Sequence, residues 1–258
     1  MADFHVIIPA RYASRRLPGK PLLDIGGKPM LQHVLERCGQ SAAKSVIVAT
    51  DDARIADAVT GFGGEVVMTS PRHRCGSDRI AEAATALGLK DDAMIVNVQG
   101  DEPDMPAALI DQVAQALADD ADAAMATACA PLDEVSQLTD SSVVKVVTDN
   151  SGHAIYFSRA AIPWVAGARG ENSSDLAPHA LQHLRRHLGI YAYSTGYIRL
   201  FASRQSCALE NLEKLEQLRA LWHGDKICCV DAVAAPSSGI DTEADLERAR
   251  QNADKLLG

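Results

Sequence analysis

Aromatic residues, positive charge and long apolar runs are all scarce in this chain of 258 residues. Phe, Trp and Tyr make up only 4% of it, so a stacked aromatic platform for single-stranded nucleic acid is not expected. The net charge of −9 also argues against nucleic acid as a partner, because the phosphate backbone attracts basic surfaces. No uninterrupted apolar stretch approaches the ~18 residues of a membrane span, so membrane insertion is not expected either.

Cysteine is present, but its spacing does not indicate a zinc site or a disulfide framework. The six cysteines are scattered and no C-x-x-C occurs. We therefore expect free thiols in a reducing compartment. The chain also lacks a basic segment followed by a long apolar one after Met1. No secretory signal is visible in it, and a cytoplasmic location is expected.

The sequence does contain a regular alternation of short apolar runs and amphipathic segments. Strands are expected at about 5–9, 45–50, 64–68, 93–98 and 123–128, and helices at about 29–39, 52–60, 77–88 and 105–118. This alternation predicts an α/β fold with a mostly parallel open sheet covered on both faces. A single domain over residues 1–258 is the simplest organisation, because this length and 47% apolar content can build one substantial core.

The alternation changes after about residue 140. Two strand-like segments flank Asn150-Ser151-Gly152, which is typical of a hairpin turn. Residues 166–180 are polar and irregular and predict a mobile loop, and a strand pattern returns at 188–194. We interpret residues 140–205 as an antiparallel subregion inserted into the domain.

Two further helices are expected near the end of the chain. The first covers 208–221, because leucines recur along one side at helical spacing: Leu209, Leu212, Leu215 and Leu218. The second follows Asp241-Thr242, and either residue could be its N-cap.

The most informative segment is VIIPARYASRRLPGK at residues 6–20. An apolar strand ends at Pro9, and the following loop supplies four cations: Arg11, Arg15, Arg16 and Lys20. Gly19 leaves space beside Lys20 for a close backbone approach. A cationic loop with glycine after the first strand is where open α/β sheets bind phosphate. In so acidic a chain, this concentration of cations favours polyphosphate binding over a merely solvated basic loop.

This loop resembles the R-x-x-S-x-R-L-P-G-K signature of cytidylyltransferases that activate 3-deoxy-keto sugars, in particular the 3-deoxy-manno-octulosonate (Kdo) cytidylyltransferase family. Further similar segments follow in order: RCGSDRIAEA at 74–83, VNVQGDEP at 96–103, VVKVV at 143–147, YFSRAAIPW at 156–164, RHLGIYAYS at 186–194, LEKLEQLRALWHGDKI at 212–227 and GIDTEADLERAR at 239–250. The resemblance implies a nucleotide-diphospho-sugar transferase-like fold, with an antiparallel dimerisation excursion. It also implies transfer of CMP from CTP to Kdo for lipopolysaccharide biosynthesis, with Mg²⁺ as cofactor and a homodimer as the active form.

Two aspartates are candidate metal ligands. Asp101 lies in the acidic turn after the strand at 93–98, where spacing alone favours a helix cap, although its carboxylate could hold Mg²⁺. Asp241 is equally plausible as a cap. The resemblance implies that both bind Mg²⁺, and a carboxylate has two oxygens, so cap and ligand roles need not conflict. Together with Lys20 and Arg16 they form the predicted catalytic set.

The nucleotide base is expected near the start of a helix at residue 76. Backbone N–H groups and the Ser77 hydroxyl could read a base edge there, and the alternative is an ordinary capped helix with an exposed Asp–Arg pair. The resemblance implies cytosine recognition, with Cys75 where the family often has serine. The predicted nucleotide-binding set is Ala10, Arg11, Arg16, Lys20, Gly76, Ser77, Arg79 and Gln99.

An acidic sugar is expected to lie against the strand at 188–194. Tyr191 and Tyr193 share one face of that strand, and His187 is an even number of residues away. The resemblance supports His187 and Tyr191, and supports Tyr193 less. The predicted sugar-binding set is Gln99, Arg159, His187, Tyr191, Glu216 and Gln217. The spacing of His179, His183 and His187 could suggest a metal-binding helix, but no H-E-x-x-H motif accompanies it.

Three other functions remain open. The nearest is a cytidylyltransferase for 8-amino-Kdo or N-acylneuraminate, although the neuraminate enzymes have a different first loop that lacks R-L-P-G-K. A non-catalytic nucleotide sensor is a second, and it would need neither both aspartates nor Lys20. A Rossmann dehydrogenase is a third, but no G-x-G-x-x-G follows the first strand.

Overall fold

The computed structural model describes residues 2–14, 16–73, 75–165, 181–237 and 239–253. Its main strands are β1 (Phe4–Ala10), β4 (Val46–Thr50), β5 (Glu65–Met68), β6 (Met94–Asn97), β7 (Ala123–Pro131), β8 (Lys145–Thr148), β9 (Ala154–Ser158), β10 (Arg185–Ser194) and β11 (Lys226–Asp231). Each strand expected in the first half is present to within a few residues. The loop expected at 166–180 lies outside the described residues.

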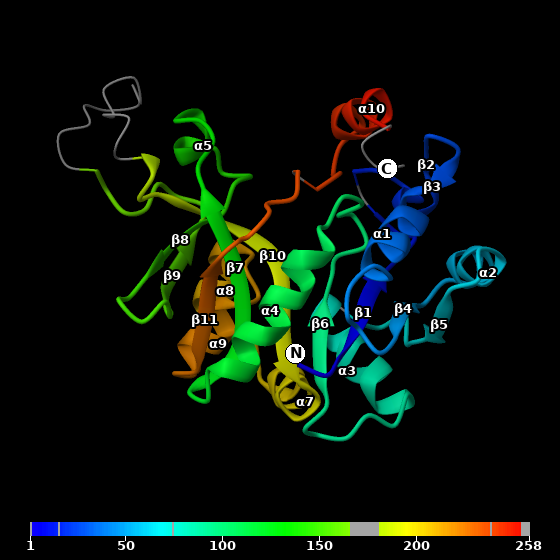
Figure 1. Cartoon of the computed structure of the whole chain (residues 1–258), viewed down its shortest axis with the longest axis horizontal. Coiled ribbons are helices and arrows are strands. Elements are labelled where there is room, and N and C mark those ends of the chain that lie inside the picture. The colour runs from blue at the N-terminus through cyan, green and yellow to red at the C-terminus, as the bar shows by residue number, and fades with distance from the viewer. Residues whose placement is uncertain (1, 15, 74, 166–180, 238, 254–258) are drawn as a thin grey trace.

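The strands form one sheet in the order β11-β7-β10-β6-β1-β4-β5 (Figure 1). Strand β1 pairs in parallel with β4 and β6, β4 pairs in parallel with β5, and β11 pairs in parallel with β7. The predicted mostly parallel α/β sheet is therefore confirmed.

Strand β10 differs from expectation. It runs antiparallel between β6 and β7, in the middle of the sheet. The sequence pattern does not predict this position, because the pairing of β10 with β6 and β7 depends on packing between segments that are far apart in the sequence. Within the range 140–205, β8 and β9 form an antiparallel hairpin, which is attached to the sheet through pairing of β8 with β10. The inserted subregion over 140–205 stays a prediction.

The helices are α1 (Met30–Cys38), α2 (Ala53–Gly61), α3 (Gly76–Ala86), α4 (Ala107–Asp119), α5 (Ser136–Thr139), α7 (Thr195–Ser203), α8 (Ala208–Glu213), α9 (Leu218–Trp222) and α10 (Glu243–Gln251). A short 3₁₀ turn, η1 (Lys20–Leu22), and a small hairpin of β2 (Asp24–Ile25) and β3 (Lys28–Pro29) precede α1. Within the described residues, no helix is long and apolar enough to cross a membrane.

Helices cover both faces of the sheet, and each face has its own hydrophobic cluster. Helices α1, α2 and α4 contribute to one cluster, and α3, α7 and α9 contribute to the other. The central strand β1 is buried between them, which explains its uninterrupted run of Val6, Ile7 and Ile8, each with no exposed surface. In α4, Leu109, Ile110 and the residues one turn later face inward, as the helical period requires.

The helix expected at 208–221 is divided in two. Helix α8 ends at Glu213, Lys214 adopts a left-handed conformation with φ of 56°, and α9 begins at Leu218. A buried ion pair between Glu210 and Arg219 joins the two pieces at 2.5 Å. In one straight helix these residues would be separated by about 13 Å along the axis. The side chain of Leu212, expected on the buried face, is 79% exposed.

Candidate active site

A large cleft opens at the carboxyl ends of β1 and β6, where the cationic loop after β1 meets the acidic turn after β6. It consists of two hollows of about 490 and 920 Å³. Five residues are shared between the linings of the two hollows: Arg11, Arg16, Gln99, Asp101 and Asp241. An open α/β sheet binds ligands at this edge, because successive strand ends and loops converge there.

The loop before the smaller hollow turns sharply at Gly19 to place Lys20. Gly19 has φ of +70°, a left-handed conformation that favours glycine. A Cβ atom at this position would lie 3.0 Å from the Tyr12 hydroxyl. The turn leads directly into η1, whose first residue is Lys20. The predicted importance of Gly19 therefore has a conformational basis in addition to ligand access.

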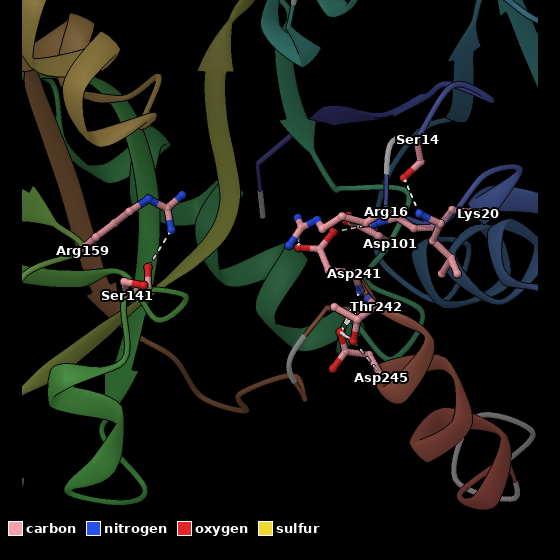
Figure 2. Close-up of polar contacts among 10 residues, drawn as sticks. Ser14, Arg16, Lys20, Asp101, Ser141, Arg159, Asp241, Thr242 and Asp245 are labelled. Carbon is pink, nitrogen blue, oxygen red and sulfur yellow. Dashed lines mark hydrogen bonds and ion pairs between the residues drawn. The ribbon is translucent and has the colours of Figure 1, made fainter.

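Lys20 lies between the two aspartates that the sequence singled out (Figure 2). Its Nζ donates to Asp101 Oδ2 at 2.6 Å and to Asp241 Oδ1 at 2.9 Å. Burial opposes the lysine charge, but attraction and hydrogen bonds from both carboxylates outweigh burial and raise the pKa of Lys20. Lys20 is therefore a cation at neutral pH, and it joins Asp101, 81 positions away in the sequence, to Asp241, 221 positions away.

Helix α10 carries Asp241 to this place by packing on the small hairpin and the loop before it. Its Leu246, with Ile240, joins a hydrophobic cluster with Leu17 and Ile25. The backbone N–H of Ile240 also donates to the Asp101 carbonyl at 3.0 Å. The two acidic segments are thus tied together by main chain as well as by Lys20.

Neither aspartate is used as a helix cap. The cap of α10 is Thr242, which forms a capping box with Asp245 (Figure 2). Helix α4 begins after Pro106 and has no side-chain cap hydrogen bond. The capping alternative for Asp101 and Asp241 is therefore not observed, and both carboxylates face the cleft.

Two arginines extend the positive charge at the mouth of the cleft. Arg16 forms an ion pair with Asp241 at 2.8 Å, and its side chain remains 64% exposed. Arg11 is exposed and lines both hollows. Ala10 and Gln99 line the smaller hollow beside them. Arg15 lies outside the described residues.

The segment expected to read the base begins helix α3. Gly76 and Ser77 line the larger hollow, and the Ser77 hydroxyl donates to Glu216 Oε2 at 2.7 Å. Arg79 does not line either hollow. It is buried, pairs with Asp51 at 3.2 Å and hydrogen bonds to Thr69. Arg79 therefore supports α3 from the interior and lies away from the cleft. It is also not part of the exposed Asp–Arg pair that the capped-helix alternative expected.

Every residue of the predicted sugar set lines the larger hollow: Gln99, Arg159, His187, Tyr191, Glu216 and Gln217. Arg159 lies apart from the Lys20 group, held by the Ser141 carbonyl at 2.8 Å (Figure 2) and by the Glu213 carbonyl at 2.8 Å. Gln217 Nε2 and the Tyr193 hydroxyl are buried without a hydrogen-bond partner among the described residues. Such atoms suit a polar ligand, because an unpaired buried polar group is costly.

Burial sets the charge state of this side of the cleft. It lowers the pKa of His187 to about 3, so the imidazole is neutral at physiological pH. Burial also raises the pKa of Tyr191, and the charge of Glu216 adds to the effect. The strand therefore presents neutral donors and acceptors beside the charged Arg159.

Several residues at or near the cleft were not singled out from the sequence, and the contacts of three of them are informative. Lys145 is completely buried, and its Nζ donates to the carbonyls of Asp140, Val143 and Arg159. Glu102 has a buried Oε2 without a partner among the described residues. Thr127 contacts His187. The signal available for Lys145 was a lysine inside the apolar run VVKVV.

The donor set for a metal ion is small. Among the described residues there is no cluster of three or more His, Cys, Asp or Glu side chains able to hold one. Asp101 and Asp241 nevertheless converge on a single cation, the Lys20 ammonium. Mg²⁺ usually takes one or two protein carboxylates and completes its shell with water and substrate phosphates. Two convergent carboxylates beside a cationic loop fit that requirement.

Comparison with known proteins gives concordant matches. A family model described as cytidylyltransferase matches residues 5–227. The 3-deoxy-manno-octulosonate cytidylyltransferase of Idiomarina loihiensis is 52% identical over 252 residues, covering 97% of this chain and 98% of that relative. The protein of the same name from Pseudomonas fluorescens is 53% identical over 248 residues, covering 96% and 97%. A solved CMP:2-keto-3-deoxy-manno-octonic acid synthetase complexed with CTP has a TM-score of 0.86 and 38% identity, over 98% of this chain and 99% of that one.

Proposed function

Since the chain belongs to the cytidylyltransferase family, we propose that it transfers CMP from CTP to 3-deoxy-manno-octulosonate. The products are CMP-Kdo and pyrophosphate. The observation that carries this proposal is the convergence of Lys20, Asp101 and Asp241 at one end of a cleft whose other end is lined by the predicted sugar residues. A cation-binding centre between two ligand spaces suits the joining of two anionic substrates.

The reaction needs little covalent chemistry from the protein. The anomeric hydroxyl of the sugar attacks the α-phosphorus, an oxygen–phosphorus bond forms, the bond to the β-phosphate oxygen breaks, and the hydroxyl proton is lost to solvent. Arg11, Arg16 and Lys20 hold the triphosphate and stabilise its developing charge. Gly76, Ser77 and Gln99 contact the nucleoside. Orientation and charge neutralisation are thus the main contributions of the chain.

Mg²⁺ is the cofactor that this chemistry needs, and Asp101 and Asp241 would hold it. When bound, it neutralises charge on the triphosphate and makes the attacking hydroxyl more acidic. Asp101→Asn and Asp241→Asn should each lower kcat/KM by about a hundredfold or more. Near-normal turnover by both variants, with Mg²⁺ dependence unchanged, would contradict this assignment.

The sugar lies in the larger hollow. Arg159 meets the sugar carboxylate, while His187, Tyr191, Glu216 and Gln217 meet its hydroxyl groups, and Gln99 lies between sugar and nucleotide. The support is that these side chains line one space, with Gln217 Nε2 buried and unpaired among the described residues. The product serves lipopolysaccharide biosynthesis, and 8-amino-Kdo is the alternative substrate of the same shape.

The active form is a homodimer in this proposal, with the β8–β9 hairpin near the contact. Ile155 on β9 is 61% exposed and Trp164 beyond it is 73% exposed, so an apolar surface is available there. Sedimentation equilibrium would give twice the chain mass. A monomer at assay concentrations that retains full activity would contradict the dimer as the active form.

A pyrophosphate-release assay over a grid of nucleotides and acidic sugars tests the whole proposal. We expect release with CTP and Kdo, and little with ATP, GTP or UTP. Equal rates with a purine triphosphate would contradict the base-reading role of the segment beginning at Gly76. Faster release with N-acylneuraminate than with Kdo would contradict the sugar assignment.

A further inference from the structure

The pairing of β10 with β7 is interrupted beside the sugar space. Leu188 is opposite Ala128, but the next register pair is Tyr191 with Thr127, so Gly189 and Ile190 have no partner on β7. A bulge of this kind leaves backbone carbonyls without ladder hydrogen bonds and often lies next to a functional site. The side chain that fills the gap is Thr127.

The Thr127 hydroxyl has three polar neighbours. It donates to the Ile190 carbonyl at 2.7 Å, has the Leu188 carbonyl at 3.2 Å, and contacts His187 Nε2 at 2.9 Å. The hydroxyl is completely buried, so water does not compete for these contacts. All four groups belong to the bulge or to the strand facing it.

Counting protons settles which atom donates in the contact with His187. A hydroxyl has one proton and two lone pairs, whereas a carbonyl can only accept. If the Thr127 proton pointed to His187, the lone pairs of the hydroxyl oxygen would face two carbonyl oxygens and be repelled by them. The proton must therefore point to a carbonyl. The oxygen then has only lone pairs to offer His187. His187 Nε2 must therefore carry a proton.

We infer that Thr127 is a positioning residue that holds His187 in its Nε2–H form, so that Nδ1 presents a hydrogen-bond acceptor to a hydroxyl group of the sugar. A neutral imidazole carries one proton, so protonation at Nε2 leaves Nδ1 as an acceptor. The identity of the ligand rests on the proposed function, whereas the proton position on His187 does not.

The orientation of the ring is fixed independently. Phe157 meets the imidazole edge to face at a centroid distance of 4.9 Å, and Tyr191 lies tilted at 5.4 Å. The neutral state is favoured by burial, which lowers the pKa of His187 to about 3. Among the described residues, Nδ1 has no hydrogen-bond partner, although the residue lines the cleft.

The acceptor character of His187 Nδ1 restricts how the sugar can be oriented in the hollow. An acceptor nitrogen attracts a hydroxyl and repels a carboxylate, so the sugar carboxylate cannot face His187. The carboxylate must face a cationic residue of the same hollow instead, such as Arg159 or Arg186. Thr127 thus acts on sugar orientation without touching the sugar.

The proton position is measured directly by ¹⁵N NMR of the wild-type protein labelled at histidine. We expect His187, assigned by comparison with His187→Gln, to show a protonated pyrrole-type Nε2 and an unprotonated pyridine-type Nδ1 at pH 7, with no substrate present. The reverse assignment, or a doubly protonated ring, would overturn the inference. This result is independent of whether Kdo is the substrate.

Steady-state kinetics tests the effect on the sugar. Thr127→Val keeps the shape of the side chain but removes the hydroxyl, and we expect the KM for Kdo to rise about tenfold with the KM for CTP within twofold. Thr127→Ser restores the hydroxyl and should bring the KM for Kdo back to within threefold of wild type. Equal increases in both KM values, or no rescue by serine, would overturn the inference.

Thr195→Val is the matched control for a merely structural effect. Thr195 is also completely buried, and its hydroxyl donates to the Ala93 carbonyl at 3.0 Å, but unlike Thr127 it does not contact His187. This variant should lower the melting temperature without changing the KM for Kdo. If Thr127→Val fails to fold, the wild-type NMR result and the Thr127→Ser kinetics decide. A wild-type enzyme inactive with CTP and Kdo would refute the proposed function and leave the NMR test standing.

Discussion

Lys20 is the residue on which the charges of the cleft converge. Its ammonium lies within 2.9 Å of carboxylates from the turn after β6 and from the start of α10. The sequence indicated Lys20, Asp101 and Asp241 separately, but it gave no distance between them. Residue type and neighbouring motif are local properties, whereas this contact depends on how α10 packs against the β2–β3 hairpin.

Lys20→Ala should lower kcat/KM by about a hundredfold or more, because it removes a charge next to the reacting phosphates. Lys28→Ala is the matched control. Lys28 also pairs with a carboxylate, Glu36 at 2.8 Å, but it does not line the cleft. Its loss should leave kcat/KM within twofold. Comparable losses in both variants would mean that the cations act only through overall charge.

The neutral state of His187 makes a separate prediction for stability. Its pKa is about 3 in the folded protein and 6.5 without the fold, so between these pH values the unfolded chain binds a proton that the folded chain does not. The stabilising contribution is complete above pH 6.5 and is lost as the pH falls toward 3. The stability advantage of wild type over His187→Gln should therefore shrink by about 1.4 kcal/mol per pH unit below about pH 6. Urea unfolding at pH 7, 5.5 and 4.5 measures it, and a constant difference would contradict the burial of a neutral imidazole.

Arg79 shows that a motif can locate a segment without predicting the role of each residue in it. The segment around it was correctly expected at the start of a helix, and Gly76 and Ser77 line the cleft. The helical period then turns Arg79 inward, to Asp51 and Thr69. Its partners come from the ends of β4 and β5, which the sequence alone could not align with α3.

At the scale of elements, Lys145 connects the β8–β9 hairpin to Arg159, which lines the larger hollow. This completely buried ammonium donates to three backbone carbonyls, at Asp140, Val143 and Arg159. It thereby ties the chain before β8 to the chain after β9. Burial lowers the pKa of Lys145, so these carbonyls are needed to hold its charge.

Lys145→Met should reduce the free energy of unfolding by about 3 kcal/mol, because it leaves buried carbonyls unpaired. It should also raise the KM for Kdo more than the KM for CTP, because Arg159 loses support. Lys226→Met serves as control, since Lys226 is exposed on β11 and pairs only with Asp122 among the described residues. Urea unfolding and steady-state kinetics measure both. A loss of stability without any change in the KM for Kdo would contradict the predicted effect of the hairpin on sugar binding.

Element types were more predictable than their partners. The apolar runs that became β1, β4 and β6 and the amphipathic α1, α2 and α4 were found within a few residues, because local periodicity encodes them. The division of 208–221 at Lys214 was missed, since the leucine spacing alone favours one helix. The turn is stabilised instead by tertiary contacts such as that of Glu210 with Arg219.

At the scale of the whole molecule, the two hollows of the cleft lie side by side on one sheet. The parallel strands β1 and β6 end at the cationic loop and the acidic turn, and the antiparallel β10 brings His187 and Tyr191 to the larger hollow. The chain then crosses back from β11 to α10, which delivers Asp241 to the smaller hollow (Figure 1). The fold class could be predicted from the sequence, and most of the predicted site residues line this cleft. The central place of β10 could not be predicted, because it depends on contacts between distant segments.

The central claim is that this cleft joins the CMP part of CTP to Kdo. Phosphorus NMR of the purified protein with CTP, Kdo and Mg²⁺ tests it most directly, because each phosphate can be followed separately. We expect the α-phosphorus signal to become that of a phosphodiester as inorganic pyrophosphate appears in equal amount, and no change when Kdo is omitted. Formation of CDP and phosphate, or pyrophosphate release without a sugar phosphodiester, would contradict the account.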